Sequence, residues 1–244
     1  MTGRAIPDPG FAGDDGSADP ALAAQLRAYA AGDGDLFAVH RALAAARVLV
    51  PVVAALAESD TGPSGLTQEK TSGMAVVTVV GRDGRRALPV FTAVETLARW
   101  RADARPTPLD ARRAALAAHD EQAVALVVDI AGPVRHVVQG PALRALAEGR
   151  ELRPADDDPE VMAAIRRAVA AVDSVTAVYA GPGQDTDLRV TLVPAAGLSP
   201  EAVRSAAGAV ADLLSADPVL RARLDAGLDL AVLPPGAPPP ANPL

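Results

Sequence analysis

The chain has 244 residues, a net charge of −7, no cysteine and only 2% aromatic side chains. Its length is near the point at which one hydrophobic core gives way to two, and the lack of cysteine excludes disulfides, thiolate nucleophiles and zinc–thiolate sites. The negative charge repels a phosphate backbone, and no apolar run reaches the roughly 20 residues of a membrane-spanning helix. We therefore expect neither a nucleic-acid partner nor a membrane partner.

The first module is expected over residues 20–150, behind a leader at 1–19 that lacks hydrophobic periodicity and is predicted to be disordered. Hydrophobic spacing and turn residues predict helices and hairpins in this module. In chain order they are helices at 20–31 and 35–46, a strand at 48–53, an exposed loop at 57–72, a hairpin of 74–80 with 86–91, a helix after Thr92, a helix at 109–119, a hairpin of 124–130 with 134–138, and a helix at 141–148.

Two residues of this module carry specific local predictions. Pro51 has no N–H to donate to a ladder, so its strand is predicted to lie at a sheet edge or to contain a bulge. Thr92 and Glu95 have the form of a capping box, in which the threonine hydroxyl caps the helix and the glutamate reaches back to the threonine amide.

A polar break at 150–158 precedes a second module at 155–234 and a proline-rich tail at 235–244. The second module is predicted as helix, two strands, helix, short helix and strand, with Asp158 and Ser199 as helix N-caps. Hairpins dominate over strand–helix–strand crossovers in both modules. The predicted fold class is therefore α+β, with two small modules that each pack helices on a mixed or antiparallel sheet.

Side chains that could carry chemistry are few and scattered. His40, His119 and His136 do not have the spacing of a helical metal site, and we interpret them as surface residues of helices and a strand. The acidic run 156–158 lacks the central glycine of a calcium loop and is interpreted as charge at a helix N-terminus. We expect no catalytic residue, no metal site and no cofactor. A site assembled in space from ordinary aspartate, arginine and serine side chains is the alternative.

Three stretches of the first module together resemble one family. They are RVLVPVV at 47–53, LPVFT at 88–92 continuing to Trp100, and ALVVDIAGP at 125–133. Their order and spacing are similar to the SseB N-terminal domain, in its actinobacterial form, over residues 35–150. The family name means enhanced serine sensitivity, and the resemblance implies a fold and a link to serine or amino-acid metabolism without an established enzymatic activity. Ile130 stands where the family usually has a proline.

The matched stretches also supply a candidate interaction surface, which consists of Pro89, Phe91, Trp100, Asp129, Gly132 and Pro133. Because aromatics are scarce, Phe91 and Trp100 are the most informative of these, and the core is favoured over a partner contact for both. We hypothesise a cytoplasmic, non-enzymatic binding or regulatory protein that contacts an unidentified protein partner. An enzyme with an unrecognised site and a homodimerisation module using edge strands of the second module are the alternatives.

Overall fold

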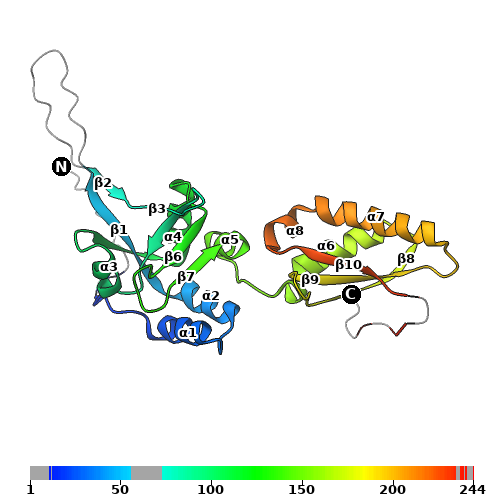
Figure 1. The fold of residues 1–244 in the computed structure, drawn as a ribbon, viewed down its shortest axis with the longest axis horizontal. Helices are drawn as coiled ribbons and strands as arrows, with labels where there is room; N and C mark the ends of the chain where they lie inside the picture. The colour runs from blue at the N-terminus through cyan, green and yellow to red at the C-terminus, as the bar shows by residue number, and fades with distance from the viewer. Residues whose placement is uncertain (1–10, 12, 56–72, 235–236, 239, 241–243) are drawn as a thin grey trace, which may run out of the picture. The chain divides into compact units, whose positions relative to one another are not determined.

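The structure is a computed structural model that describes residues 11, 13–55, 73–234, 237–238, 240 and 244. The chain divides into two compact units, 1–152 and 153–244, and the division falls inside the polar break of the sequence (Figure 1). Each unit packs helices on mixed or antiparallel sheets, which confirms the α+β prediction. No helix within the described ranges is long and apolar enough to cross a membrane.

The first unit contains two sheets, with strand orders β2-β1-β5 and β3-β4-β6-β7. Its elements are α1 (Pro20–Ala31), α2 (Leu36–Ala45), β1 (Arg47–Ala55), β2 (Gly73–Val76), β3 (Val79–Val80), β4 (Arg86–Val90), α3 (Val94–Trp100), β5 (Arg105–Asp110), α4 (Ala111–Asp120), β6 (Ala125–Val128), β7 (His136–Gln139) and α5 (Gly140–Glu148). The two sheets are joined by backbone pairing of Leu49 with Phe91. In the larger sheet β4 and β6 are parallel, so their carboxyl ends lie side by side.

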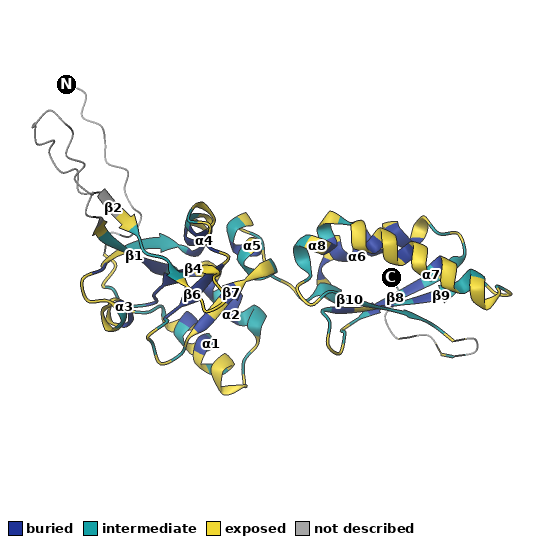
Figure 2. Cartoon of the chain, turned by 45° about the horizontal axis from the view of Figure 1, so that its top comes forward, coloured by how far each residue is buried: buried dark blue, intermediate teal, exposed yellow. Residues whose placement is uncertain are grey.

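Apolar side chains of the first unit form two cores. The larger core packs α1, α2, α4 and α5 against alternate strand residues such as Leu88 and Leu126. The smaller core contains Leu49, Phe91 and Leu97, and because side chains alternate along a strand, it lies on the other face of β1 and β4. Figure 2 shows this burial concentrated on the strands and on the helix faces turned toward them.

The hairpins of the first unit follow the sequence prediction in part. The β3–β4 and β6–β7 pairs are antiparallel hairpins, as predicted. The predicted strand 74–80 is instead divided, because β2 pairs with β1 and only β3 pairs with β4. The predicted loop 57–72 lies outside the described residues.

β1 pairs on both sides, so the edge position predicted from Pro51 is wrong. On one side β1 pairs with β5, and on the other Leu49 pairs with Phe91 before β2 takes over. The Pro51 carbonyl accepts a hydrogen bond from the Val77 amide at 3.2 Å. An N–H at position 51 would point to the side on which the partner of β1 changes from Phe91 to β2. Its absence from Pro51 is therefore tolerated.

β5 is a strand that the sequence prediction missed because it contains two prolines. Pro106 and Pro108 lie opposite Pro51 and Leu49 in the register with β1. The backbone N–H and C=O of Leu49 both form hydrogen bonds with Phe91. Pro108, which lies opposite Leu49 on the other side, is therefore at a position where no backbone N–H is needed for strand pairing. Helix α4 consequently begins two residues later than predicted.

The second unit is a three-stranded sheet of order β10-β9-β8, in which β9 is antiparallel to β8 and parallel to β10. Helices α6 and α7 pack on one face of this sheet (Figure 1). Asp158 and Ser199 are the N-caps that the sequence predicted. Homodimerisation through the edge strands of this unit stays a prediction. Its elements are η1 (Ala155–Asp157), α6 (Pro159–Ala170), β8 (Val175–Gly181), β9 (Leu188–Pro194), α7 (Pro200–Ala216), α8 (Pro218–Arg223) and β10 (Leu228–Val232).

Candidate functional site

A buried carboxylate ties together the loops that leave the carboxyl ends of β4 and β6. Asp129 Oδ1 accepts hydrogen bonds from the Thr92 amide (2.9 Å) and the Thr96 hydroxyl (2.7 Å), and Oδ2 accepts one from the Thr92 hydroxyl (2.6 Å). Asp129 is only 5% exposed and has a φ of 49°, which few residues other than glycine adopt. Three hydrogen bonds compensate the burial of this carboxylate and fix both loops.

Thr92 does not cap helix α3, contrary to the capping-box prediction. The helix begins at Val94 with Ala93 in the N-cap position. The Thr92 hydroxyl instead donates to Asp129 Oδ2, which the β6 loop brings next to it. Glu95 pairs with Arg99 one turn further along α3.

Residues 13–18, which we call the pinned segment, belong to the leader that was predicted to be disordered. The Arg47 guanidinium donates to both carboxylate oxygens of Asp14 and to the Ser17 carbonyl. It also donates to the Thr92 carbonyl, which belongs to the β4 loop. Charge-assisted bonds from a single arginine thus order the pinned segment against the strand ends, while residues 1–10 and 12 lie outside the described residues.

The pinned segment also makes a close backbone contact with helix α3. The Val94 amide donates to the Gly16 carbonyl at 2.9 Å. Gly16 has a φ of 80°, which residues with a side chain rarely adopt, and a Cβ atom there would lie 2.6 Å from Val94 Cγ2. The backbone conformation and the contact with Val94 therefore both favour glycine at this position.

The pinned segment, helix α1 and the two strand-end loops enclose a cavity of about 620 Å³, which we call the strand-end cavity. Thr92, Thr96 and Asp129 line it, and α1 contributes Arg27. In the part of the chain that the structure describes, Arg27 forms no ion pair or hydrogen bond. Asp15 also lines the cavity, and hydrogen bonds from Ser17 lower the pKa of this carboxyl, so it is ionised at neutral pH. The cavity thus combines a free guanidinium with a carboxylate that forms no ion pair among the described residues, although the charge of Arg47 acts on it.

The structure brings three of the six residues of the candidate interaction surface to this cavity. Asp129 and Pro133 line it, and Gly132 packs against Asp129. Pro133 is exposed, whereas Asp129 is buried and fully hydrogen-bonded.

The other three residues lie in or beside the smaller core. Pro89 and Phe91 are buried and offer no surface to a partner. Trp100 is half-buried and packs against Phe91 with ring centroids 5.3 Å apart. A partner contact at Trp100 stays a prediction. Sequence reasoning missed the roles of Thr96 and Arg47, because their partners are far away along the chain.

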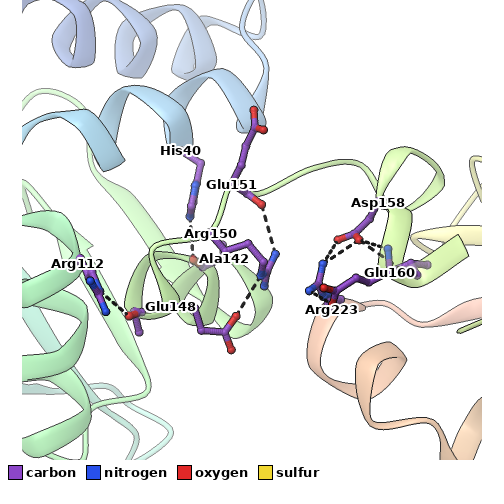
Figure 3. Close-up of polar contacts among 11 residues, drawn as sticks. His40, Arg112, Ala142, Glu148, Arg150, Glu151, Asp158, Glu160 and Arg223 are labelled. Carbon is purple, nitrogen blue, oxygen red and sulfur yellow. Dashed lines mark hydrogen bonds and ion pairs between the residues drawn. The ribbon is translucent and has the colours of Figure 1, made fainter. Parts of the chain in front are cut away.

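Two of the three histidines are buried, contrary to their interpretation as surface residues. His40 Nε2 lies 2.8 Å from the Ala142 carbonyl (Figure 3), and the His136 ring packs edge-on against Tyr29. Burial lowers the pKa of both imidazoles. Neither lines the strand-end cavity, and over the described ranges no three histidine, aspartate or glutamate side chains are placed to hold a metal ion.

Comparison with known proteins gives one match. A family model described as the SseB protein N-terminal domain matches residues 22–145, just over half of the chain. No curated protein and no solved structure matches the chain. The matched region contains Arg47, Thr92 and Asp129, whereas the pinned segment precedes it.

Proposed function

The chain belongs to the SseB family, and on this premise we propose that it is a non-enzymatic binding protein whose first unit takes a free amino acid in the strand-end cavity. The observation that carries the proposal is the presence of Arg27 and Asp15 in one cavity, neither of which forms an ion pair among the described residues. A free amino acid carries the complementary carboxylate and ammonium groups. The serine sensitivity in the family name makes L-serine the first ligand to test.

The position and build of the cavity support a ligand site. Ligands of α/β proteins commonly bind beyond the carboxyl ends of parallel strands, where loops diverge and leave a crevice. A volume of about 620 Å³ is within the range of small-molecule sites. The bonds from Thr92 and Thr96 to Asp129 fix its floor, and Arg47 fixes the pinned segment as its wall. A cavity that is already formed loses little entropy when a ligand binds.

The hydrogen bonding of Asp129 supports binding rather than catalysis. A general base needs an oxygen lone pair directed at the substrate. Both oxygens of Asp129 instead accept hydrogen bonds from threonines of the neighbouring loop, which gives this carboxylate a structural task. Trp100 and the exposed Pro133 remain our candidates for contact with a protein partner of the ligand-bound form, in a cytoplasmic setting.

The proposal is tested by titrating the ¹⁵N-labelled full-length chain with L-serine and then with the other protein amino acids. We expect saturable amide shifts in residues 15–17 and 92–96. Ethanolamine lacks the carboxylate and 3-hydroxypropionate lacks the ammonium group, so both should bind more weakly. Arg27→Gln should weaken binding by about tenfold or more. Arg144→Gln changes an exposed arginine of α5 outside the cavity and should leave binding unchanged.

Two results would overturn the proposal. The first is the absence of saturable shifts with every amino acid. The second is a set of shifts that leaves residues 15–17 and 92–96 unaffected.

A further inference from the structure

A second cavity in the first unit is lined by three arginines. It has a volume of about 540 Å³ and lies between α2, α4 and α5; we call it the arginine groove. Arg41, Arg112 and Arg150 line it, against the two carboxylates of Asp110 and Glu151. Arg41 pairs with Glu151 and Arg150 pairs with Glu148, so among these three arginines Arg112 is the one without an ion pair in the described part of the chain.

Arg150 carries a buried donor that has no acceptor. Its Nε donates to Glu148 Oε2 at 3.0 Å, and its Nη1 makes a long contact of 3.4 Å with the Glu151 carbonyl (Figure 3). Its Nη2 is buried without a hydrogen-bond partner. Buried N–H groups are nearly always paired in folded proteins, so an unpaired one costs free energy, and a turn of the Arg150 side chain into the groove would give this donor an acceptor from outside the chain.

Arg112 offers further donors beside the same helix end. Its Nε donates to the Ala147 carbonyl at 3.3 Å. It makes no other hydrogen bond or ion pair with the described part of the chain, so both terminal amino groups are available. A Cβ atom at Gly149 would lie 3.5 Å from Arg112 Cδ and 3.6 Å from its Nε, so the guanidinium lies next to this glycine. Gly149 ends α5 in the left-handed conformation and leads directly into Arg150.

The remaining walls of the groove are largely apolar. Ala44, Ala145 and Leu146 line it together with the buried ring of His40. An apolar surrounding strengthens the attraction between a guanidinium and an anion, because fewer waters compete for the charges.

We propose that the arginine groove binds a small molecule through a phosphate group, which accepts hydrogen bonds from Arg112 and from Nη2 of Arg150 once the Arg150 side chain turns into the groove. Several guanidinium forks around one cavity suit a dianion with many acceptor oxygens better than a single carboxylate, which has only two. A nucleic acid fits less well because the chain is acidic and the groove lining contains no phenylalanine, tyrosine or tryptophan on which a base could stack. This site is separate from the amino-acid cavity and does not depend on it.

Two of the three histidines provide a direct test by ¹H NMR on the full-length chain. His40 lines the groove, whereas the exposed His119 at the end of α4 does not. Inorganic phosphate at fixed pH and ionic strength should shift the His40 ring signals saturably and leave those of His119 in place, and acetate should shift neither. A phosphate monoester such as glycerol 3-phosphate should bind more tightly than inorganic phosphate, because its carbon chain can contact the apolar walls. Tighter binding of inorganic phosphate would overturn the assignment to an organic phosphate.

Three variants separate binding from a structural role. Arg112→Gln and Arg150→Met should each weaken phosphate binding about tenfold or more, and Arg144→Gln should not change it. Arg150→Met also removes the unpaired donor, so without phosphate its unfolding midpoint should stay close to that of the wild type. A purely structural arginine would give a clear loss of stability. The proposal fails if phosphate gives no saturable His40 shift, if both groove variants bind like the wild type, or if only oligonucleotides bind.

Discussion

Arg47 and Asp14 form a two-pronged ion pair that ties the residues before α1 to the first residue of β1. The two side chains are only 12% and 18% exposed. The same guanidinium donates to the carbonyls of Ser17 and Thr92, so one arginine links the pinned segment to the loop after β4. Desolvation of the pair is offset because every nitrogen of the guanidinium has an acceptor.

Arg47→Met should therefore destabilise the first unit and release the pinned segment. We expect a loss of about 2–3 kcal/mol of unfolding free energy, because the change leaves Asp14 and two carbonyls without their donor. Urea unfolding followed by the fluorescence of Trp100, the only tryptophan, reports on the first unit. Arg105→Gln on the edge strand β5 is the control. A midpoint of Arg47→Met equal to that of the wild type would contradict this role.

Gly132→Ala should destabilise the first unit at the candidate site. A Cβ atom at Gly132 would lie 2.8 Å from Asp129 Cβ and 3.2 Å from the Asp129 carbonyl oxygen. Asp129 cannot move away easily, because Thr92 and Thr96 hold its carboxylate. We expect a loss of about 1–3 kcal/mol, measured by urea unfolding, together with shifted Thr92 and Thr96 amide signals.

The control for this prediction is Gly208→Ala in helix α7, where a Cβ atom meets nothing within 4 Å. Alanine is the better helix former there, so the second unit should gain up to about 1 kcal/mol. If Gly132→Ala and Gly208→Ala changed the unfolding free energy equally, the close packing around Gly132 would not contribute to stability.

Local signals explain which parts of the fold the sequence predicts. Asp158 and Ser199 cap helices by accepting hydrogen bonds from amides two or three residues further on, so the pattern is visible in a short stretch. The two prolines hid β5 from the sequence prediction. A strand accepts a proline only where its missing N–H would not pair with a neighbouring strand, and this depends on the arrangement of the sheet. Strand pairing is a long-range property that a local pattern does not contain.

The candidate site depends on such long-range partners. Thr92 and Asp129 are 37 residues apart, and Arg47 and Asp14 are 33 residues apart. The capping-box prediction failed at Thr92 because a distant carboxylate took the hydroxyl that the local pattern assigned to the helix. The leader was predicted to be disordered from its own composition. The sequence of the leader does not show that Arg47 of β1 binds Asp14.

The ion pair between Arg223 and Asp158 should stabilise the second unit. Arg223 Nη1 donates to both carboxylate oxygens of Asp158, at 2.8 and 2.6 Å, and Nη2 donates to Glu160 (Figure 3). Arg223→Met would leave the buried Asp158 without its cation, and we expect a loss of about 3 kcal/mol of unfolding free energy. Urea unfolding followed by circular dichroism measures it, with Arg166→Gln on the exposed face of α6 as control.

The same pair makes an acid-dependent prediction. Burial alone would raise the pKa of Asp158, but the bonds from Arg223 and from two amides lower it below its usual value. Stability from this carboxylate is present above the unfolded pKa near 3.8 and is lost as the pH falls through the folded pKa. In Arg223→Met the folded pKa of Asp158 should rise toward or above the unfolded value, so the part of the acid-induced loss of unfolding free energy that comes from this carboxylate should shrink or disappear. An unchanged acid transition would contradict this assignment.

The buried pair His40 and His136 should make the first unit less stable in mild acid. Burial lowers the folded-state pKa of both below the ordinary value of 6.5, and a charge on His40 would lower that of His136 further. Between the folded pKa and 6.5, the unfolded chain therefore binds more protons than the folded chain. Unfolding free energy should fall in this window as the pH decreases, by up to about 1.4 kcal/mol per pH unit for each histidine. The folded-state pKa values of Asp14 and Asp158 are lowered from the ordinary 3.8, so these carboxyls change the pH dependence of stability only below about pH 4. They do not contribute in the window of the histidines.

Urea unfolding followed by Trp100 fluorescence at about pH 7.5, 6.5 and 5.5 measures the effect. The double variant His40→Gln with His136→Phe removes both titrating groups while keeping an amide donor near the Ala142 carbonyl and an aromatic ring against Tyr29. It should flatten the pH dependence even if its stability at neutral pH is lower, because slope and absolute stability are separate quantities. His119→Gln changes only an exposed imidazole and should retain the wild-type slope. A double variant with the full wild-type slope would show that other groups carry the acid sensitivity of the first unit.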